Sequence, residues 1–193
     1  MVTIREEARR DIAARDALLD LAYGASRLAK TSERLREGRI PVDGLSLVAV
    51  DDSKIVGTVR LWHVTAGPGR AALLLGPLAV DPAHRNRGVG TALVRRAVAR
   101  ARLAGHRAIV LVGDAAYYGR FGFVAARTGE LWMPGRYDRD RLLALELQPD
   151  AMAGARGLIA ATGAFTPKAD LNTLIAANDG DRRPRRARVQ RAA

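Results

Sequence analysis

The sequence predicts an α/β domain built around a mixed, mostly antiparallel central sheet with one parallel crossover. Three observations predict this fold class. Strand-like segments alternate with turn residues between residues 45 and 80. An amphipathic helix follows them, and a short apolar strand follows the helix. In such a strand–helix–strand unit, a ligand is expected where the crossover begins.

The first forty residues are expected to form one short strand and two helices. Val2 to Arg5 can form the strand. In the following segment, RRDIAARDALLDLAYG, apolar residues recur with a helical period. A second helix is expected from about Ser26 to Arg36. The residues assigned to the apolar face of the first helix are Ile12, Ala13, Leu18, Leu19 and Leu21.

A β-hairpin is predicted where LSLVAVDD and KIVGTVRLWHV flank the turn residues Asp52 and Ser53. The glycines and the proline of TAGPGR indicate a second turn, so the next antiparallel strand runs from Ala72 to Val80. Pro77 lies inside this strand. Because proline has no N–H to donate to a ladder, it indicates an interruption there, with a regular edge strand as the alternative interpretation.

The crossover helix is predicted in VGTALVRRAVARARLAG, after Pro82 and a polar loop, and is closed by Gly105. Its apolar residues share one arc of a helical wheel, and its arginines fall outside that arc. RAIVLVG, from Arg107, is almost continuously apolar, as is typical of a parallel strand buried on both faces. A short helix in AAYYGR, a strand beginning in FGFVAA and a last strand from Arg141 complete the prediction.

Length and charge indicate one folded domain followed by a basic tail. The chain has 193 residues, of which 48% are hydrophobic, and a net charge of +12. We expect the domain at residues 1–167 and a disordered basic tail at 168–193, where six arginines cluster after Asp181. No aromatic residue interleaves these arginines, so a solvated tail is favoured over binding to nucleic acid.

Several classes of site and location are excluded by composition. The chain has no cysteine, which excludes disulfides, thiolate zinc sites and a cysteine nucleophile. His63, His84 and His106 are scattered, so no metal is expected. No apolar run reaches the roughly 18 residues of a membrane span, and the first residues lack the apolar core of a signal peptide. A cytoplasmic protein without a membrane partner is expected.

A candidate phosphate-binding loop lies between the strand and the crossover helix. Backbone N–H groups at a helix start are unpaired and carry the positive end of the helix dipole, so they can bind a pyrophosphate. Glycine allows the backbone to approach the anion closely. The patterns of other phosphate loops, GxxxxGK[ST] and the three-glycine dinucleotide fingerprint, are absent. The loop consists of Arg85, Asn86, Arg87, Gly88, Val89, Gly90 and Thr91.

Two motifs carry a resemblance to a known family. The pattern R-x-x-G-x-G from Arg85 to Gly90, preceded by LGPLAVDP, resembles the acetyl-CoA signature of the GNAT superfamily of N-acetyltransferases. YGRFGF, from Tyr118 to Phe123, is similar to the family's Y-x-x-x-G-F segment, and the run GDAAYYGRFGF is similar to YhbS-like predicted acetyltransferases. The resemblance is specific between these motifs and becomes diffuse toward Leu147.

The resemblance implies a GNAT fold whose fourth strand splays to form a CoA-binding cleft. It implies that an amine attacks acetyl-CoA directly, with both substrates bound. Backbone amides of Leu78, Ala79 and Val80 would hold the pantetheine and polarise the thioester, and the loop from Arg85 to Thr91 would hold the pyrophosphate. Tyr118 matches the family's acid that protonates the departing thiolate. Tyr117 is then the expected core filler.

The sequence also departs from the family pattern. An asparagine often found before the tyrosine is Leu111 here, and Asp114 is the only polar candidate nearby. The general base is open, because the fourth strand has no acid and the third offers only His63. A water-mediated or absent base ranks above that lone histidine.

The acceptor is expected to be a small-molecule or peptide amine, chosen by residues of about Asp20 to Arg39 and by LWMPGRYDRD, where Trp132 and Arg136 are candidates. The oligomeric state is left open, with a dimer included. Two alternatives also stay open. The chain could be a non-catalytic CoA-binding or regulatory module of the same fold, or it could bind nucleic acid through its tail.

Overall fold

The computed structural model describes residues 1–167, so the predicted basic tail lies outside the described residues. The helices are α1 (Ile12–Tyr23), α2 (Val89–Leu103) and α3 (Ala115–Gly119). The strands are β1 (Thr3–Glu6), β2 (Ser46–Asp51), β3 (Lys54–Ala66), β4 (Ala71–Val80), β5 (Ala108–Val112), β6 (Leu131–Trp132), β7 (Leu142–Glu146) and β8 (Gly157–Ala161).

The strands form one mixed sheet in the order β1-β2-β3-β4-β5-β7. All neighbours along this order are antiparallel except β4 and β5, which are parallel and joined through α2. Strand β8 pairs with the far end of β3 and carries the short β6. The predicted mixed, mostly antiparallel sheet with a parallel crossover is therefore confirmed.

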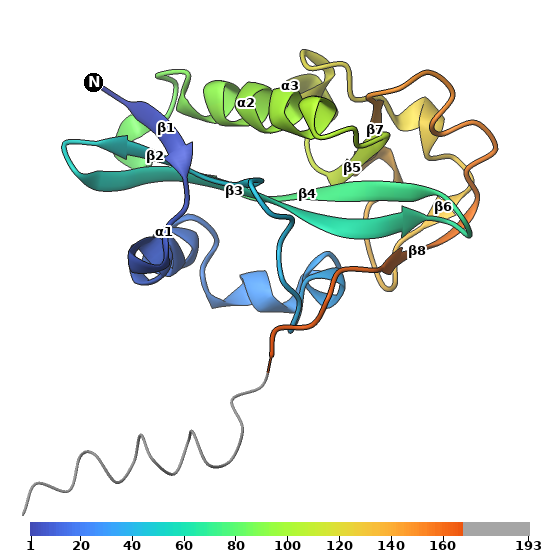
Figure 1. The fold of residues 1–193 in the computed structure, drawn as a ribbon, viewed down its shortest axis with the longest axis horizontal. Helices are drawn as coiled ribbons and strands as arrows, with labels where there is room; N and C mark the ends of the chain where they lie inside the picture. The colour runs from blue at the N-terminus through green and yellow to red at the C-terminus, as the bar shows by residue number, and fades with distance from the viewer. Residues whose placement is uncertain (168–193) are drawn as a thin grey trace, which may run out of the picture.

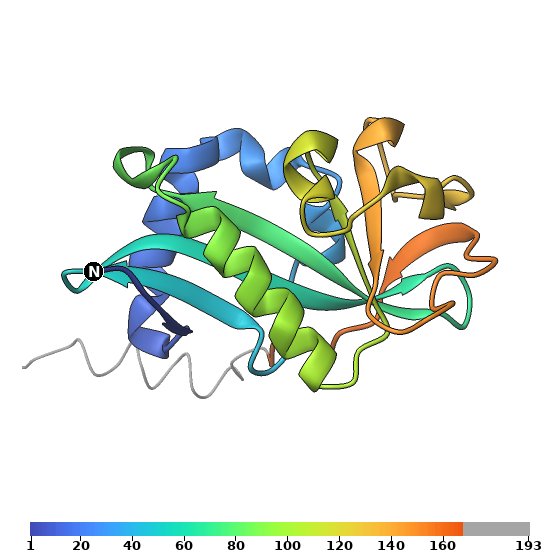
Figure 2. The ribbon, with the colours of Figure 1, turned by 90° about the horizontal axis from the view of Figure 1, so that it is seen from above.

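Helix α2 crosses one face of the sheet and supplies its main core (Figure 1, Figure 2). The helix begins after Gly88, and its arginines face away from the sheet or toward its rim. Burial of a continuous apolar arc against the β-branched and leucine side chains of the strands fixes the helix on this face. The buried residues of the arc are Val89, Leu93, Val94, Ala97 and Ala101, as predicted.

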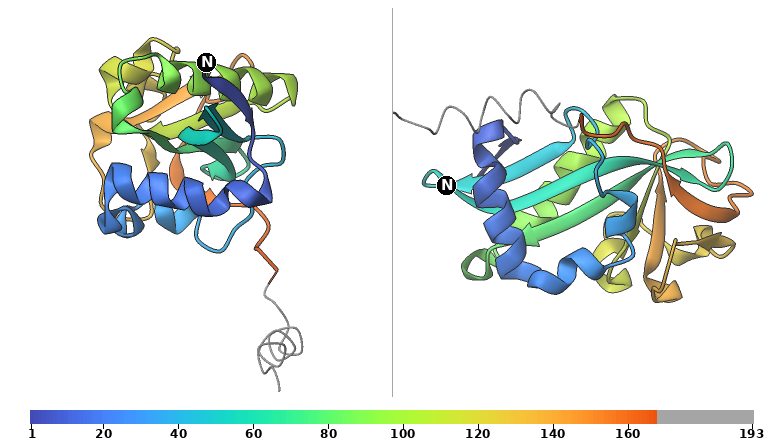
Figure 3. Two further views of the ribbon diagram at one scale, coloured as in Figure 1. Left: turned by 90° about the vertical axis from the view of Figure 1, so that its left-hand side faces the viewer. Right: turned by 90° about the horizontal axis from the view of Figure 1, so that it is seen from below.

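Helix α1 lies on the opposite face (Figure 3). Leu18 and Leu19 are buried against Ala79 of β4, as the helical period predicts. The other residues predicted for the apolar face are not buried, so that part of the prediction is wrong. Arg15 is buried in their place, and its Nε lies 3.8 Å from a carboxylate oxygen of Glu7. The exposed residues are Ile12, Ala13 and Leu21.

The predicted helix from Ser26 to Arg36 is wrong. Two short 3-10 helices, Ala25–Ala29 and Glu33–Leu35, replace it, with Lys30 in an extended conformation between them. Contacts to a distant loop hold this segment in place, since Arg34 donates a hydrogen bond to the carbonyl of Pro134 at 2.9 Å. Tertiary contacts therefore override the weak local preference for a helix.

The strand expected in FGFVAA is also wrong. Only Val124 makes a bridge, to Ala144, and a 3-10 helix, Ala125–Arg127, follows at once. Strands β6 and β8 were not predicted. Both strands are short, and β8 is half exposed. Their sequences do not alternate apolar with polar residues, which is the pattern that predicts a strand.

Candidate active site

Strand β4 separates from β5 after a short shared stretch. The two strands pair only at Leu73 with Ile109 and at Leu74 with Val110, whereas β4 continues to Val80 along β3. Beyond Leu74, the edge of β4 that faces β5 is therefore left without a partner strand among the described residues. This separation gives the splayed strand that the resemblance implies, visible in Figure 2 where β4 and β5 diverge.

The separation coincides with an irregularity at Pro77. The register between β3 and β4 shifts here, so that Gly76 and Pro77 stand opposite Arg60 alone. The indole nitrogen of Trp62 donates a hydrogen bond to the Gly76 carbonyl at 2.6 Å. This bond satisfies a carbonyl that the irregular pairing of β3 with β4 leaves without a backbone partner. The predicted interruption of the strand at Pro77 is thus observed, as an irregularity in the pairing of β4 with β3.

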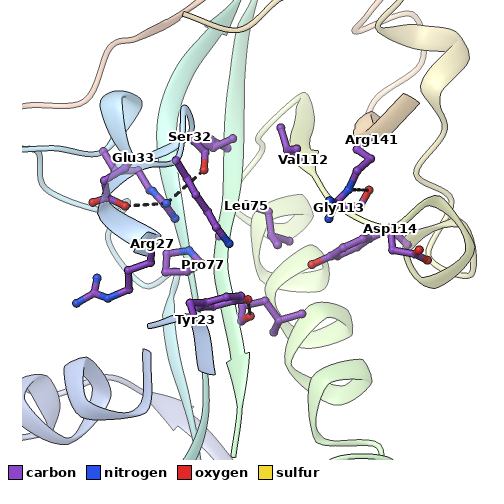
Figure 4. A pocket seen from close by; sticks show the side chains of 16 residues that line it. Tyr23, Arg27, Ser32, Glu33, Leu75, Pro77, Val112, Gly113, Asp114 and Arg141 are labelled. Carbon is purple, nitrogen blue, oxygen red and sulfur yellow. Dashed lines mark hydrogen bonds and ion pairs between the residues drawn. The ribbon is translucent and has the colours of Figure 1, made fainter. Parts of the chain in front are cut away.

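A cavity of about 250 Å³ fills the space between the separated strands. One wall consists of β4 from Leu74 to Leu78, and the opposite wall of Val112–Asp114. Figure 4 shows Tyr23 and Pro77 at its floor, Ser32 and Glu33 on one side, and Arg141 on the other. The segment that precedes β2 and the start of β7 therefore close the cavity from two sides.

Tyr118 lines this cavity from α3. Asp114 caps that helix by accepting the Tyr117 N–H at 2.6 Å. The Tyr118 ring lies directly on Gly113, where a Cβ atom would overlap it, and makes an edge contact with Phe123 at 5.9 Å between centroids. Burial, and then the neighbouring Tyr23 and Tyr117, raise the pKa of its hydroxyl, which therefore keeps its proton at neutral pH.

Tyr117 does not fill the core, and this prediction is wrong. Successive helical residues point about 100° apart, so the two tyrosines face different surroundings. Tyr118 packs on the main core, while Tyr117 is half-buried and reaches Gly90 at the start of α2. Its outer face is covered by the Arg120 guanidinium, 4.9 Å from the ring centroid.

The predicted phosphate loop presents a row of free backbone donors. The first hydrogen bond of α2 runs from the Ala92 N–H to the Gly88 carbonyl at 2.9 Å. Within the described part of the chain, no acceptor is found for the N–H groups of residues 86–91. Asn86 and Gly88 adopt left-handed conformations, with φ of 61° and 79°, which turn these donors outward.

The remaining predicted binding residues differ in whether their backbone or their side chain can contact a ligand. The side chains of Val89 and Ala79 are buried, so only their backbone amides can meet a ligand. Val80 brings the end of β4 to the start of α2, since its Cγ2 lies 3.5 Å from the place of a Cβ on Gly90. Leu78 lines the cavity, and its carbonyl accepts a hydrogen bond from the Tyr23 hydroxyl. Exposed polar side chains complete the loop at Arg85, Asn86 and Arg87.

The structure adds cavity residues that the sequence did not single out. They belong to the segment expected to choose the acceptor and to the start of β7, and no motif marks them. Among the candidates named beforehand, His63 is exposed and its ring lies 5.8 Å from that of His106, outside the cavity. Trp132 also lies outside, beneath the Arg139 guanidinium. The added residues are Tyr23, Lys30, Arg36 and Arg141.

Two kinds of feature are absent from residues 1–167. No helix there is long and apolar enough to cross a membrane. No three His, Cys, Asp or Glu side chains there come together as metal ligands.

The comparisons with known proteins agree with this geometry. A family model for the acetyltransferase (GNAT) domain matches residues 43–125. YhbS of Escherichia coli K12, described as an uncharacterized N-acetyltransferase, is 33% identical over 161 residues, which cover 81% of this chain and 93% of that protein. This chain belongs to the GNAT family of N-acetyltransferases.

Solved structures of GNAT proteins resemble this GNAT acetyltransferase over most of its length. YhbS of Escherichia coli in complex with CoA matches with a TM-score of 0.69 and 31% identity, covering 83% of this chain and 89% of that one. A GNAT family acetyltransferase from Brucella melitensis in complex with acetyl-CoA matches with a TM-score of 0.65 and 29% identity, covering 84% and 96%. The splayed β4 and the crossover through α2 therefore belong to the GNAT fold.

Proposed function

We propose that this GNAT acetyltransferase transfers the acetyl group of acetyl-CoA to an amine while both substrates are bound. The proposal rests on the separation of β4 from β5, which leaves a cavity between the two strands. The protonated phenol of Tyr118 lines this cavity, and the free backbone N–H groups at the start of α2 lie beside it. The complexes of YhbS with CoA and of the Brucella melitensis protein with acetyl-CoA support the same donor substrate.

The loop before α2 fits a pyrophosphate. A helix N-terminus with free N–H groups attracts negative charge, and the exposed Arg85 and Arg87 add to that attraction. No atom lies within 4 Å of the place of a Cβ on Gly88, so the backbone is open to a ligand there. We assign the backbone amides of residues 86–91 and the side chain of Arg85 to the pyrophosphate, and the backbone amides of Leu78, Ala79 and Val80 to the pantetheine and the thioester carbonyl.

The reaction requires positioning and one proton donor, not an enzyme nucleophile. The amine lone pair attacks the thioester carbon, the new C–N bond forms as the C–S bond breaks, and the sulfur takes a proton from Tyr118. The proton that the attacking nitrogen loses passes to water, and the Tyr118 phenolate takes a proton back from water, which restores the acid. Both acids that line the cavity are engaged, Glu33 with Arg36 at 2.8 Å and Asp114 with the Tyr117 N–H, which supports a water-mediated base or none.

A titration with acetyl-CoA tests the proposal. Saturating acetyl-CoA should raise the melting temperature, because a ligand at 100 times its Kd stabilises the folded state by about 2.7 kcal/mol. A screen of amines with thiol detection should then find an acceptor that accelerates CoA release. The absence of any thermal shift at saturating acetyl-CoA would count against the assignment of this site.

We also propose that the acetyltransferase domain ends at residue 167 and that the protein is cytoplasmic.

A further inference from the structure

Cations from two segments that are distant in sequence converge on the cavity. Lys30 comes from the extended residue between the two 3-10 helices, Arg36 from the end of the second, and Arg141 from the residue before β7. Burial lowers the pKa of Lys30, and the positive charges of Arg141 and Arg36 lower it further. The Lys30 side chain therefore lies close enough to Arg141 and Arg36 to be repelled by both.

Carboxylates neutralise this cluster only in part, because Glu33 pairs with Arg36 alone. In residues 1–167, neither Lys30 nor Arg141 has an ion-pair partner. The Lys30 ammonium lies over the Tyr23 ring, 4.3 Å from its centroid, and Arg141 contacts only the Gly113 carbonyl, at 3.5 Å. Like charges held together in a partly dry cavity are unfavourable unless an anion joins them.

Arg36 is the most deeply buried member of the cluster. Its side chain is 6% exposed, and Glu33 is its only carboxylate partner in the described structure, with a weak second contact to Ser32. Its Nε is buried with no partner among these residues. Its Nη1 lies 3.6 Å from the place of a Cβ on Gly76, next to the irregularity in β4. A buried guanidinium with unused donors is costly, and an anionic ligand in the cavity would reduce that cost.

An adjoining hollow carries the same sign of charge. It shares Lys30 and Arg141 with the cavity and adds Arg34 and Arg136 to its lining. Its one acid, Asp138, caps the following turn by accepting the Asp140 N–H at 3.2 Å. The positive surface therefore extends from the cavity into this hollow.

We propose that the acceptor amine of this enzyme carries an anionic group, a carboxylate or a phosphate, which Lys30, Arg36 and Arg141 bind. The inference rests on the proposed function and narrows it. A polycationic acceptor would be repelled by this wall, because two like charges 4 Å apart near a protein surface cost about 4 kcal/mol.

Matched pairs of amines test the inference. β-Alanine is compared with n-propylamine, 4-aminobutanoate with n-butylamine, and O-phosphoethanolamine with ethanolamine. Initial rates are followed by thiol release, and binding to the CoA-loaded protein is followed by calorimetry. We expect the anionic member of at least one pair to have the larger kcat/KM, by tenfold or more, and to bind more tightly. The carboxylate and phosphate pairs separate the two kinds of anion.

Single variants identify the residues responsible. Lys30→Met and Arg141→Gln should each reduce the preference for the anionic amine by roughly 10- to 100-fold, as expected for loss of a charged hydrogen bond. Arg95→Gln is the matched control, since it removes one positive charge from the exposed face of α2. The preference of Arg95→Gln for the anionic amine should equal that of the parent protein.

The outcomes for the two proposals are distinct. If neutral amines are acetylated as well as or better than their anionic partners, the inference is overturned and the acetyltransferase proposal stands. If no amine releases CoA and acetyl-CoA causes no thermal shift, the proposed function fails. In that case calorimetry with the same amines and the protein alone still decides whether the cavity prefers anions, because equal binding of the charged and uncharged amines contradicts the inference.

Discussion

The hydroxyl oxygen of Tyr117 lies 2.8 Å from the position that a Cβ atom on Gly90 would occupy. The missing side chain of Gly90 thus lets α3 contact the first turn of α2, beside the free N–H groups of the loop. Val80, at the end of β4, approaches the same point at 3.5 Å. Three elements of the proposed CoA site therefore meet at one glycine.

Gly90→Ala should weaken CoA binding about tenfold, or by ~1.4 kcal/mol, because the methyl group displaces the Tyr117 hydroxyl toward the loop. Isothermal titration with CoA measures the effect. The double variant Gly90→Ala/Tyr117→Phe removes the oxygen that clashes and should recover most of the affinity. Unchanged CoA affinity in Gly90→Ala would show that the pyrophosphate lies elsewhere. Gly88 is a less suitable position, since its φ of 79° adds backbone strain to any substitution.

Tyr118→Phe should lower the rate of acetyl transfer by roughly 10²- to 10⁴-fold, the contribution of a positioned general acid. The melting temperature and the affinity for acetyl-CoA should change little, because the hydroxyl has no hydrogen-bond partner within residues 1–167. Tyr117→Phe serves as the control for turnover once acetyl-CoA is saturating. Full activity of Tyr118→Phe when chemistry limits the rate would exclude Tyr118 as the acid.

The pH–rate profile provides an independent check on the same residue. Burial raises the pKa of Tyr118 above its ordinary value of 10, so the acid form persists at alkaline pH. Loss of activity through ionisation of this phenol should therefore not begin below pH 10. A descending alkaline limb between pH 7 and 9 that disappears in Tyr118→Phe would contradict the raised pKa.

Asp11 should make the stability of the fold depend on acid pH. Arg5 donates to its carboxylate at 2.9 Å and the Ala8 N–H at 2.7 Å, and these contacts, Arg5 first, lower its pKa from 3.8 to about 2. Because the folded-state pKa is depressed, the stabilisation is present above about pH 4 and is lost as the pH falls toward 2.

Asp11→Ala should therefore lower the free energy of unfolding at pH 7 by about 1–3 kcal/mol, the usual cost of leaving buried polar groups unpaired. Urea denaturation at several pH values should show the difference between parent and variant narrowing below pH 4. Asp140→Ala, which removes an exposed carboxylate, is the control. A difference that stays constant down to pH 2 would contradict the lowered pKa of Asp11.

Gly67→Ala should destabilise the protein by about 1–3 kcal/mol, because a Cβ atom there would overlap the carbonyl oxygen of Arg156. Gly69→Ala is a matched control in the same turn. Both glycines have a positive φ, of 78° and 71°, but nothing lies within 4 Å of the added atom at Gly69. Thermal denaturation should show a clearly larger loss at Gly67. Equal losses would mean that backbone strain alone limits this turn.

The hairpin, the antiparallel strand that follows it, the crossover and the loop at the start of α2 could be predicted from the sequence. These features depend on local information, namely the alternation of apolar residues, turn residues such as Asp52 and Ser53, and the apolar arc from Val89 to Ala101. Pro77 also acts locally, since its missing N–H interrupts a strand wherever that strand pairs. The family motifs lie in this same stretch, so the resemblance was specific there.

Only the tertiary structure decided which side chains face the cavity. Arg141 is distant in sequence from Lys30 and Arg36, and each of the three looks like an ordinary surface cation until the chain folds. The segment from Ser26 to Arg36 takes its shape from contacts with Pro134 and its neighbours, which overcome a helix preference of a few tenths of a kcal/mol per residue. Tyr117 and Tyr118 are adjacent in sequence, but the short helix α3 turns one toward Gly90 and the other toward the core. Local patterns determined the elements of this protein, whereas long-range packing determined the charge and the walls of its site.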